Sequence, residues 1–161
     1  MPIVDDQSLD VVRLLRFPLP LWLRAQEHVD ELLREFALVT QGEAAHPDSV
    51  PRRLLDLIAA LSATYAGMAA RTEEHRDDAI RRGETETDLT YQVPPGVSAA
   101  VRQLGEMLDE ADEYCRQGAH LLTLQTPPEQ VRFRRWFLSE FEVQLAGGPA
   151  TPWPDDTAAA P

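Results

Sequence analysis

Apolar residues recur every three or four positions in four stretches of the chain, and this spacing predicts four amphipathic helices. The longest stretch, Asp48 to Gly83, is expected to form one continuous central helix. Its stripe starts apolar and ends polar, and comprises Leu54, Ile58, Leu61, Tyr65, Met68, Thr72, His75 and Ala79. The first half of this helix is rich in alanine, so neighbouring helices can approach it closely on more than one face.

Proline and glycine positions set the expected limits of the other three helices, because proline suits the first helical turn and glycine the position after the last. These helices are expected at about Leu19–Thr40, from near Pro95–Ser98 to Gly118, and at about Pro127–Leu145. Thr126 and Glu129 form a capping box at the start of the last one, with an expected contribution of about 1 kcal/mol. The short connection at residues 42–47 favours an antiparallel return.

The expected fold is therefore all-α: an antiparallel four-helix bundle with a long central second helix. We assign residues 1–146 to this single domain and residues 147–161 to a flexible tail rich in proline and alanine. Residues 11–17 are either a short strand or an extended arm, and residues 88–93 alternate like a short strand. A minor two-stranded pairing between these segments is left open.

Composition narrows the class of protein. The chain has 27 acidic and 15 basic residues and a formal charge of -12, which disfavours nucleic acid as a partner. It contains no lysine, so a Schiff base or a Walker lysine is excluded. The single cysteine, Cys115, and an acidic N-terminus without signal-peptide character predict a cytoplasmic protein. The longest uncharged run of the central helix has the length of a core helix, so no membrane partner is expected.

Three acidic pairs, each with one-turn spacing, raise the alternative of a metal-dependent nucleotide hydrolase or a small-molecule sensor. Paired carboxylates inside a bundle can hold divalent cations. The pairs are Glu27 with Asp30, Glu74 with Asp77, and Glu110 with Glu113. Solvated helix faces are the simpler interpretation, because Glu27 and Asp30 lie opposite the apolar stripe of their helix. No catalytic residue and no cofactor is assigned from the sequence.

Two basic or aromatic regions are instead candidate surfaces for a protein partner or for self-association. Arg71, His75 and Arg76 lie in the polar end of the central helix, where the stripe cannot bury much apolar area. Arg132, Arg135 and Trp136 belong to a dense basic spot in the last helix. The simpler interpretation for each is structural: a half-buried histidine satisfied by a carboxylate, and salt bridges to acidic faces.

Trp153, between two prolines of the tail, has two interpretations. It either folds back over the helices or serves as an extended docking motif, since prolines reduce the entropy lost on binding. A large loss of thermal stability on deleting the tail would support the first.

Residues 12–15, 27–36, 126–129 and 134–137 resemble a family of uncharacterised small acidic helical proteins of GC-rich actinobacteria. That family is loosely associated with gene sets for anti-sigma and partner-switching regulators, and the resemblance brings no catalytic residue. It implies a non-enzymatic regulatory or accessory protein that acts through protein contacts, with bacterial signalling as the expected setting.

Overall fold

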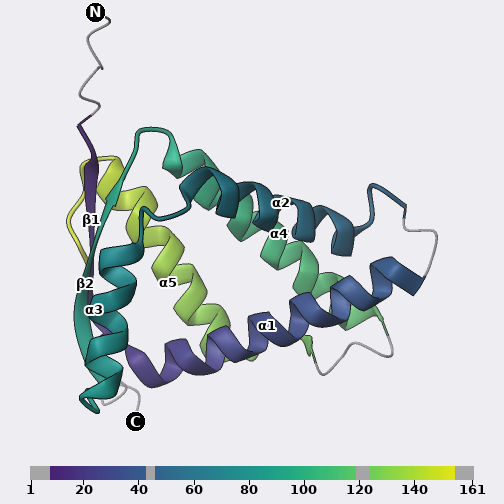
Figure 1. Ribbon diagram of the computed structural model, residues 1–161, viewed down its shortest axis with the longest axis horizontal. Helices are drawn as coiled ribbons and strands as arrows, with labels where there is room; N and C mark the ends of the chain where they lie inside the picture. Colours follow the sequence, from purple (N-terminus) through teal and green to yellow (C-terminus); the bar gives the residue numbers. More distant parts are fainter. Residues whose placement is uncertain (1–7, 43–45, 119–123, 155–161) are drawn as a thin grey trace, which may run out of the picture.

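The computed structural model describes residues 8–42, 46–118 and 124–154, and within these ranges the chain forms five helices and two strands. In chain order they are β1 (Asp10–Pro18), α1 (Leu19–Gly42), α2 (Val50–Tyr65), α3 (Ala70–Arg81), β2 (Glu86–Val93), α4 (Val97–Gln117) and α5 (Pro128–Leu145). The protein is mostly helical, but the expected four-helix bundle is wrong, because a two-stranded sheet and an additional short helix form one end of the molecule (Figure 1).

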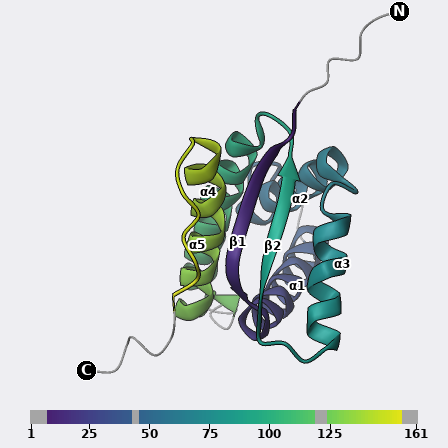
Figure 2. The ribbon, with the colours of Figure 1, turned by 90° about the vertical axis from the view of Figure 1, so that its left-hand side faces the viewer.

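The two segments left open as strands pair with each other. β1 and β2 are antiparallel, with Val12 opposite Tyr91 and Leu14 opposite Leu89, and the register shifts between Leu14 and Phe17. Alternation along β1 directs Val12 and Leu14 inward, and the register shift brings Phe17 to the same face, where all three side chains are fully buried. Figure 2 shows α3 along one side of this sheet and α5 along the other.

Both long edges of the sheet are covered by side chains. The Gln144 amide of α5 pairs with the backbone of Arg13, accepting from its nitrogen at 2.9 Å and donating to its oxygen at 2.7 Å. On the opposite edge, the Thr72 hydroxyl of α3 donates to the carbonyl oxygen of Thr90 at 2.5 Å. These bonds occupy backbone groups on each edge that could otherwise pair with another strand.

The single central helix expected at residues 48–83 is also wrong, because the chain turns between α2 and α3. Gly67 lies in this turn with φ of 78°, a left-handed conformation that glycine adopts without strain. Thr72 and Ala79 of α3 are buried, whereas Met68 in the turn is 47% exposed. The alanine-rich face of α2 is also largely exposed rather than central, since Ala59, Ala60 and Ala63 are open to solvent.

α1 and α4 lead away from the sheet, and α2 and α5 return toward it (Figure 1). Two clusters of buried side chains fill this arrangement. One cluster lies around the sheet and contains Phe17, whose ring contacts Trp22, Phe133, Trp136 and Phe137 at centroid distances of 5.5–6.5 Å. The other lies farther along the long helices and contains Phe36, Leu54, Met107 and Cys115.

The capping box expected at the start of α5 does not form. Thr126 donates from both its nitrogen and its hydroxyl to Oδ1 of Asp112, at 3.0 and 2.6 Å, so its side chain anchors the loop to α4. Pro127 occupies the N-cap position instead, with no side-chain capping bond.

Candidate functional site

A mainly apolar cavity of about 390 Å³ lies among α1, α2, α4 and α5, the four longest helices. Its size is within the range of small-molecule sites. The residues around it are Trp22, Ala25, Gln26, His28, Val29, Leu32 and Leu33 of α1, Ile58 of α2, Leu104 and Leu108 of α4, Thr126, and Gln130, Phe133, Arg134, Phe137 and Leu138 of α5.

The cavity lies between the two hydrophobic clusters. Trp22 and Phe137 at its wall pack against the cluster around the sheet, whereas Leu33, Ile58 and Leu108 pack against the other cluster. Each of these five side chains is only half-buried. The apolar stripes of four helices therefore converge here without completely covering one another.

Two polar atoms in this wall are removed from solvent and unpaired. Nε2 of His28 and Oε1 of Gln130 have no hydrogen-bond partner within residues 8–42, 46–118 and 124–154. Gln130 is 9% exposed as a whole, and both residues line the cavity. An unsatisfied buried polar group costs about 1–3 kcal/mol, so two of them in one apolar cavity require an explanation.

The surrounding polar contacts fix the wall next to these two residues. Arg24, one turn before His28, forms an ion pair of 3.3 Å with Glu129, which precedes Gln130. Arg134 contacts Asp109 and Asp112, at 2.8 Å in each case, and its side chain is only 14% exposed. The charge of Arg134 at the cavity is therefore neutralised by α4.

The candidate residues of α3 mostly serve the fold. The Arg76 guanidinium lies 3.9 Å from the ring centroid of Trp22 and 3.0 Å from Asp77. Nε2 of His75 lies 3.2 Å from the Thr87 hydroxyl, so this exposed histidine contacts β2. Arg71 is exposed at the start of α3. The structure thus places these three on one helix, with two of them in contact with other elements.

The basic and aromatic candidates of α5 lie beside the described part of the tail. The Arg132 guanidinium lies 5.6 Å from the Trp153 ring centroid, and Trp136 Nε1 donates to the Thr151 oxygen at 2.9 Å. Trp153 itself is only 7% exposed. Arg135 is exposed, with no ion-pair partner in the described part of the chain. Residues 155–161 of the expected tail lie outside the described residues.

The acidic pairs stay on three separate helices. Asp30 accepts from Gln26 at 3.1 Å, Glu110 pairs with Arg53 at 2.8 Å, and Glu113 accepts from Gln117 at 2.7 Å. Glu27 and Glu74 are exposed, and Asp77 binds Arg76. Over the three described ranges, no three histidine, cysteine or acidic side chains gather as a metal site would need. The convergence needed for the metal-dependent alternative is absent there.

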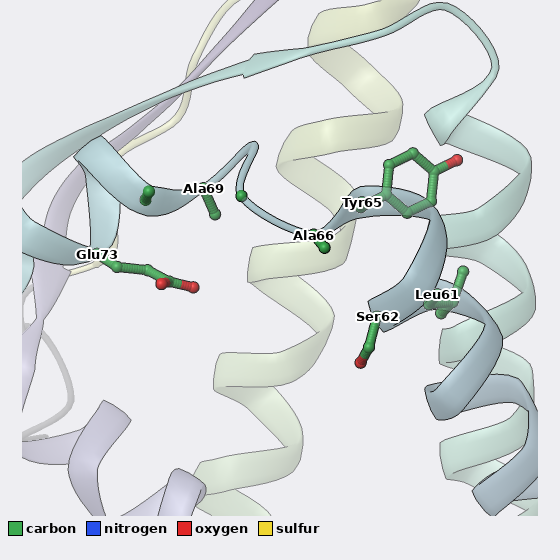
Figure 3. A pocket seen from close by; sticks show the side chains of 8 residues that line it. Leu61, Ser62, Tyr65, Ala66, Ala69 and Glu73 are labelled. Carbon is green, nitrogen blue, oxygen red and sulfur yellow. The ribbon is translucent and has the colours of Figure 1, made fainter.

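A second depression, of about 380 Å³, lies at the turn between α2 and α3. Figure 3 shows Leu61, Ser62 and Tyr65 on its α2 side and Glu73 on its α3 side. Its polar side chains, Ser62 and Glu73, are both exposed to solvent. It therefore lacks the buried, unpaired groups that distinguish the cavity between the long helices.

Sequence reasoning did not select His28 or Gln130, although a signal for them exists. His28 continues the spacing of Leu21, Ala25 and Leu32, and Gln130 continues that of Phe133 and Phe137. Each is thus a polar residue within an apolar stripe, in steps of three and four. Such a position indicates either a satisfied core residue or a binding group.

No described helix is long and apolar enough to cross a lipid bilayer. Comparison with protein-family models, with curated proteins and with solved structures gives no match for this chain.

Proposed function

We propose that this protein is a non-enzymatic binding protein that takes a small, largely apolar molecule into the cavity between its four long helices. The observation that carries the proposal is the pair of buried, unpaired polar atoms, Nε2 of His28 and Oε1 of Gln130, in an otherwise mainly apolar wall. Apolar lining with a few convergent polar groups is the usual composition of a ligand site. A ligand that hydrogen-bonds with these atoms offsets the free-energy penalty of leaving them unpaired in the folded protein.

The wall is suited to recognition rather than to reaction. Leu33, Ile58 and Leu108 supply dispersion contacts and a water-poor surface, and the two polar atoms supply orientation. The guanidinium of Arg134 in this wall already forms ion pairs with Asp109 and Asp112. Binding therefore changes packing between the two hydrophobic clusters, which gives a ligand a route to alter the stability or surface of the whole protein.

The test uses N-phenyl-1-naphthylamine, a neutral apolar probe that fluoresces in apolar sites. Titration of the full chain is expected to give saturable binding at one site. Ala25→Phe places a ring in the cavity, because Ala25 lines it, and is expected to abolish this binding. Ala59→Phe is the matched control, since Ala59 is exposed on α2 and does not line the cavity.

Circular dichroism and thermal melting are used to check that both variants are folded before binding is compared. Saturable binding by the native chain and by Ala59→Phe, with loss only in Ala25→Phe, supports the proposal. Absence of saturable binding by the native chain refutes it. Equal affinity in Ala25→Phe places the probe elsewhere and removes the cavity as the site.

A second candidate is a regulatory or accessory protein in bacterial signalling that acts through protein contacts. The exposed Arg135, without an ion-pair partner in the described ranges, favours it, together with the resemblance to partner-switching gene sets. Arg135→Glu is expected to remove a co-purifying partner in pull-downs from the native cell, whereas Arg52→Glu, at another exposed arginine, is not. Identical pull-downs from both variants would count against this surface.

A further inference from the structure

The two unpaired atoms in the cavity define the polar group that a ligand must carry. Oε1 of Gln130 is a carbonyl oxygen, so it accepts hydrogen bonds and never donates them. Nε2 of His28 donates or accepts according to the tautomer of the ring. With the His28 proton on Nε2, a matching ligand presents a donor to Gln130 and an acceptor to His28.

The ion pair between Arg24 and Glu129 joins α1 to α5 beside both residues. His28 follows Arg24 by one helical turn, and Gln130 directly follows Glu129. The two residues therefore line the cavity from neighbouring parts of α1 and α5. A hydroxyl donates one hydrogen bond and accepts two, so it pairs with both atoms when His28 carries its proton on Nε2: it donates to Gln130 Oε1 and accepts from Nε2–H.

Charged groups fit this wall less well. A carboxylate cannot donate to Gln130, and the positive charge of Arg134 that could attract it is held by Asp109 and Asp112. An ammonium can donate to Gln130 but cannot accept from Nε2–H of His28, and it would lose its hydration in a mainly apolar cavity, with those two carboxylates already paired. The remaining chemistry is that of a neutral molecule.

We propose that the cavity recognises a neutral, largely apolar alcohol or phenol, whose hydroxyl donates to Gln130 Oε1 and accepts from His28 Nε2 in the tautomer with the proton on that nitrogen. This inference rests on the proposed function, because it assigns a ligand class to the same cavity. The apolar body of the ligand contacts the wall that Leu33, Ile58 and Leu108 form. A volume of about 390 Å³ accommodates a bicyclic molecule.

The test measures how well naphthalene, 2-naphthol and 2-naphthoate displace N-phenyl-1-naphthylamine from the full chain at neutral pH. The three compounds share one apolar body and differ only in the polar group. We expect 2-naphthol to bind roughly tenfold more tightly than naphthalene, because two neutral hydrogen bonds are added, and 2-naphthoate to bind most weakly. Dissociation constants are corrected for the probe's own affinity.

Gln130→Met removes the acceptor while keeping the length of the side chain. We expect it to reduce the advantage of 2-naphthol over naphthalene to about twofold or less without weakening the binding of naphthalene. Gln26→Met is the matched control, since Gln26 also lines the cavity but is exposed and bonded to Asp30. If Gln130→Met does not fold, His28→Leu gives the same comparison at the other atom.

The outcomes separate this inference from the function on which it rests. Displacement by all three compounds without preference for 2-naphthol, or a preference that persists in Gln130→Met or His28→Leu, overturns the hydroxyl assignment and leaves the binding function standing. Failure of every compound, and of the probe itself, overturns the binding function and this inference together. A preference that Gln26→Met keeps and Gln130→Met loses supports the inference.

Discussion

Individual polar side chains hold together segments that are far apart in the sequence. Glu140 is only 3% exposed and accepts from Gln144 at 2.8 Å and from the backbone nitrogen of Thr151 at 2.9 Å. Gln144 in turn completes the edge of β1 by pairing with Arg13. Each of these bonds satisfies a buried or edge group, and together they join α5 to both the strand and the tail.

The buried thiol of Cys115 is expected to be unreactive in the native protein. Burial, with a smaller contribution from the nearby Asp112 carboxylate, raises its pKa from the ordinary value of 9.0 to about 11. A shift of this size lowers the thiolate population at neutral pH by about 100-fold relative to an exposed thiol. Labelling by Ellman's reagent should be slow in buffer and fast in guanidinium, and rapid labelling of the native chain would contradict the packing described.

The same shift predicts a loss of stability in alkali. The raised pKa means that the folded state favours the neutral thiol, so its contribution is complete below pH 9.0 and is lost as pH rises toward about 11. Tyr91, whose pKa burial raises to about 12, contributes a similar loss at still higher pH. Cys115→Ala separates the two, because urea unfolding of that variant should decline less between pH 9 and 11 than that of the native chain.

Among the elements, proline and glycine positions predicted the ends of helices well. They did not predict the break that tertiary packing introduces within an expected helix. Helix α1 was expected to begin at Leu19 and α5 to end at Leu145, and both do, because proline and glycine act through the local backbone. The break between α2 and α3 was missed because the apolar spacing continues in register through Met68. In the packed molecule α2 contacts α4 and α3 contacts β2, and the turn between them is a feature of this packing that periodicity alone does not reveal.

The same limit applies to the cavity. Its wall residues were recognised as helix stripes, for example Trp22, Val29 and Leu32, because each stripe is visible within its own helix. That these stripes leave space between them depends on how four helices are placed relative to one another. The two polar atoms could be suspected from their stripe positions, but their lack of partners is a property of the packed molecule.

For the whole molecule, the sheet end is completed by the start of the tail. Trp153 donates from its backbone nitrogen to the Leu15 oxygen at 3.0 Å and packs edge-on against Phe133 and Trp136, at centroid distances of 5.9 and 5.4 Å. The described part of the tail therefore folds back onto β1 and α5, one of the two interpretations that the sequence left open. Residues 149–154 thus belong to the packed structure around the first cluster.

Trp153→Ala is expected to lower the free energy of unfolding by about 3 kcal/mol, since it deletes a large ring that is 7% exposed. For a chain of this length, that loss corresponds to a decrease in Tm of roughly 6–12 °C. Trp153→Phe keeps a ring against Phe133 and should cost less, and Leu38→Ala, at a side chain 56% exposed on α1, should change Tm little. Calorimetry of the three variants measures this order. If Trp153→Ala has the same Tm as Leu38→Ala, the Trp153 ring contributes little to the fold and is free to bind a partner instead.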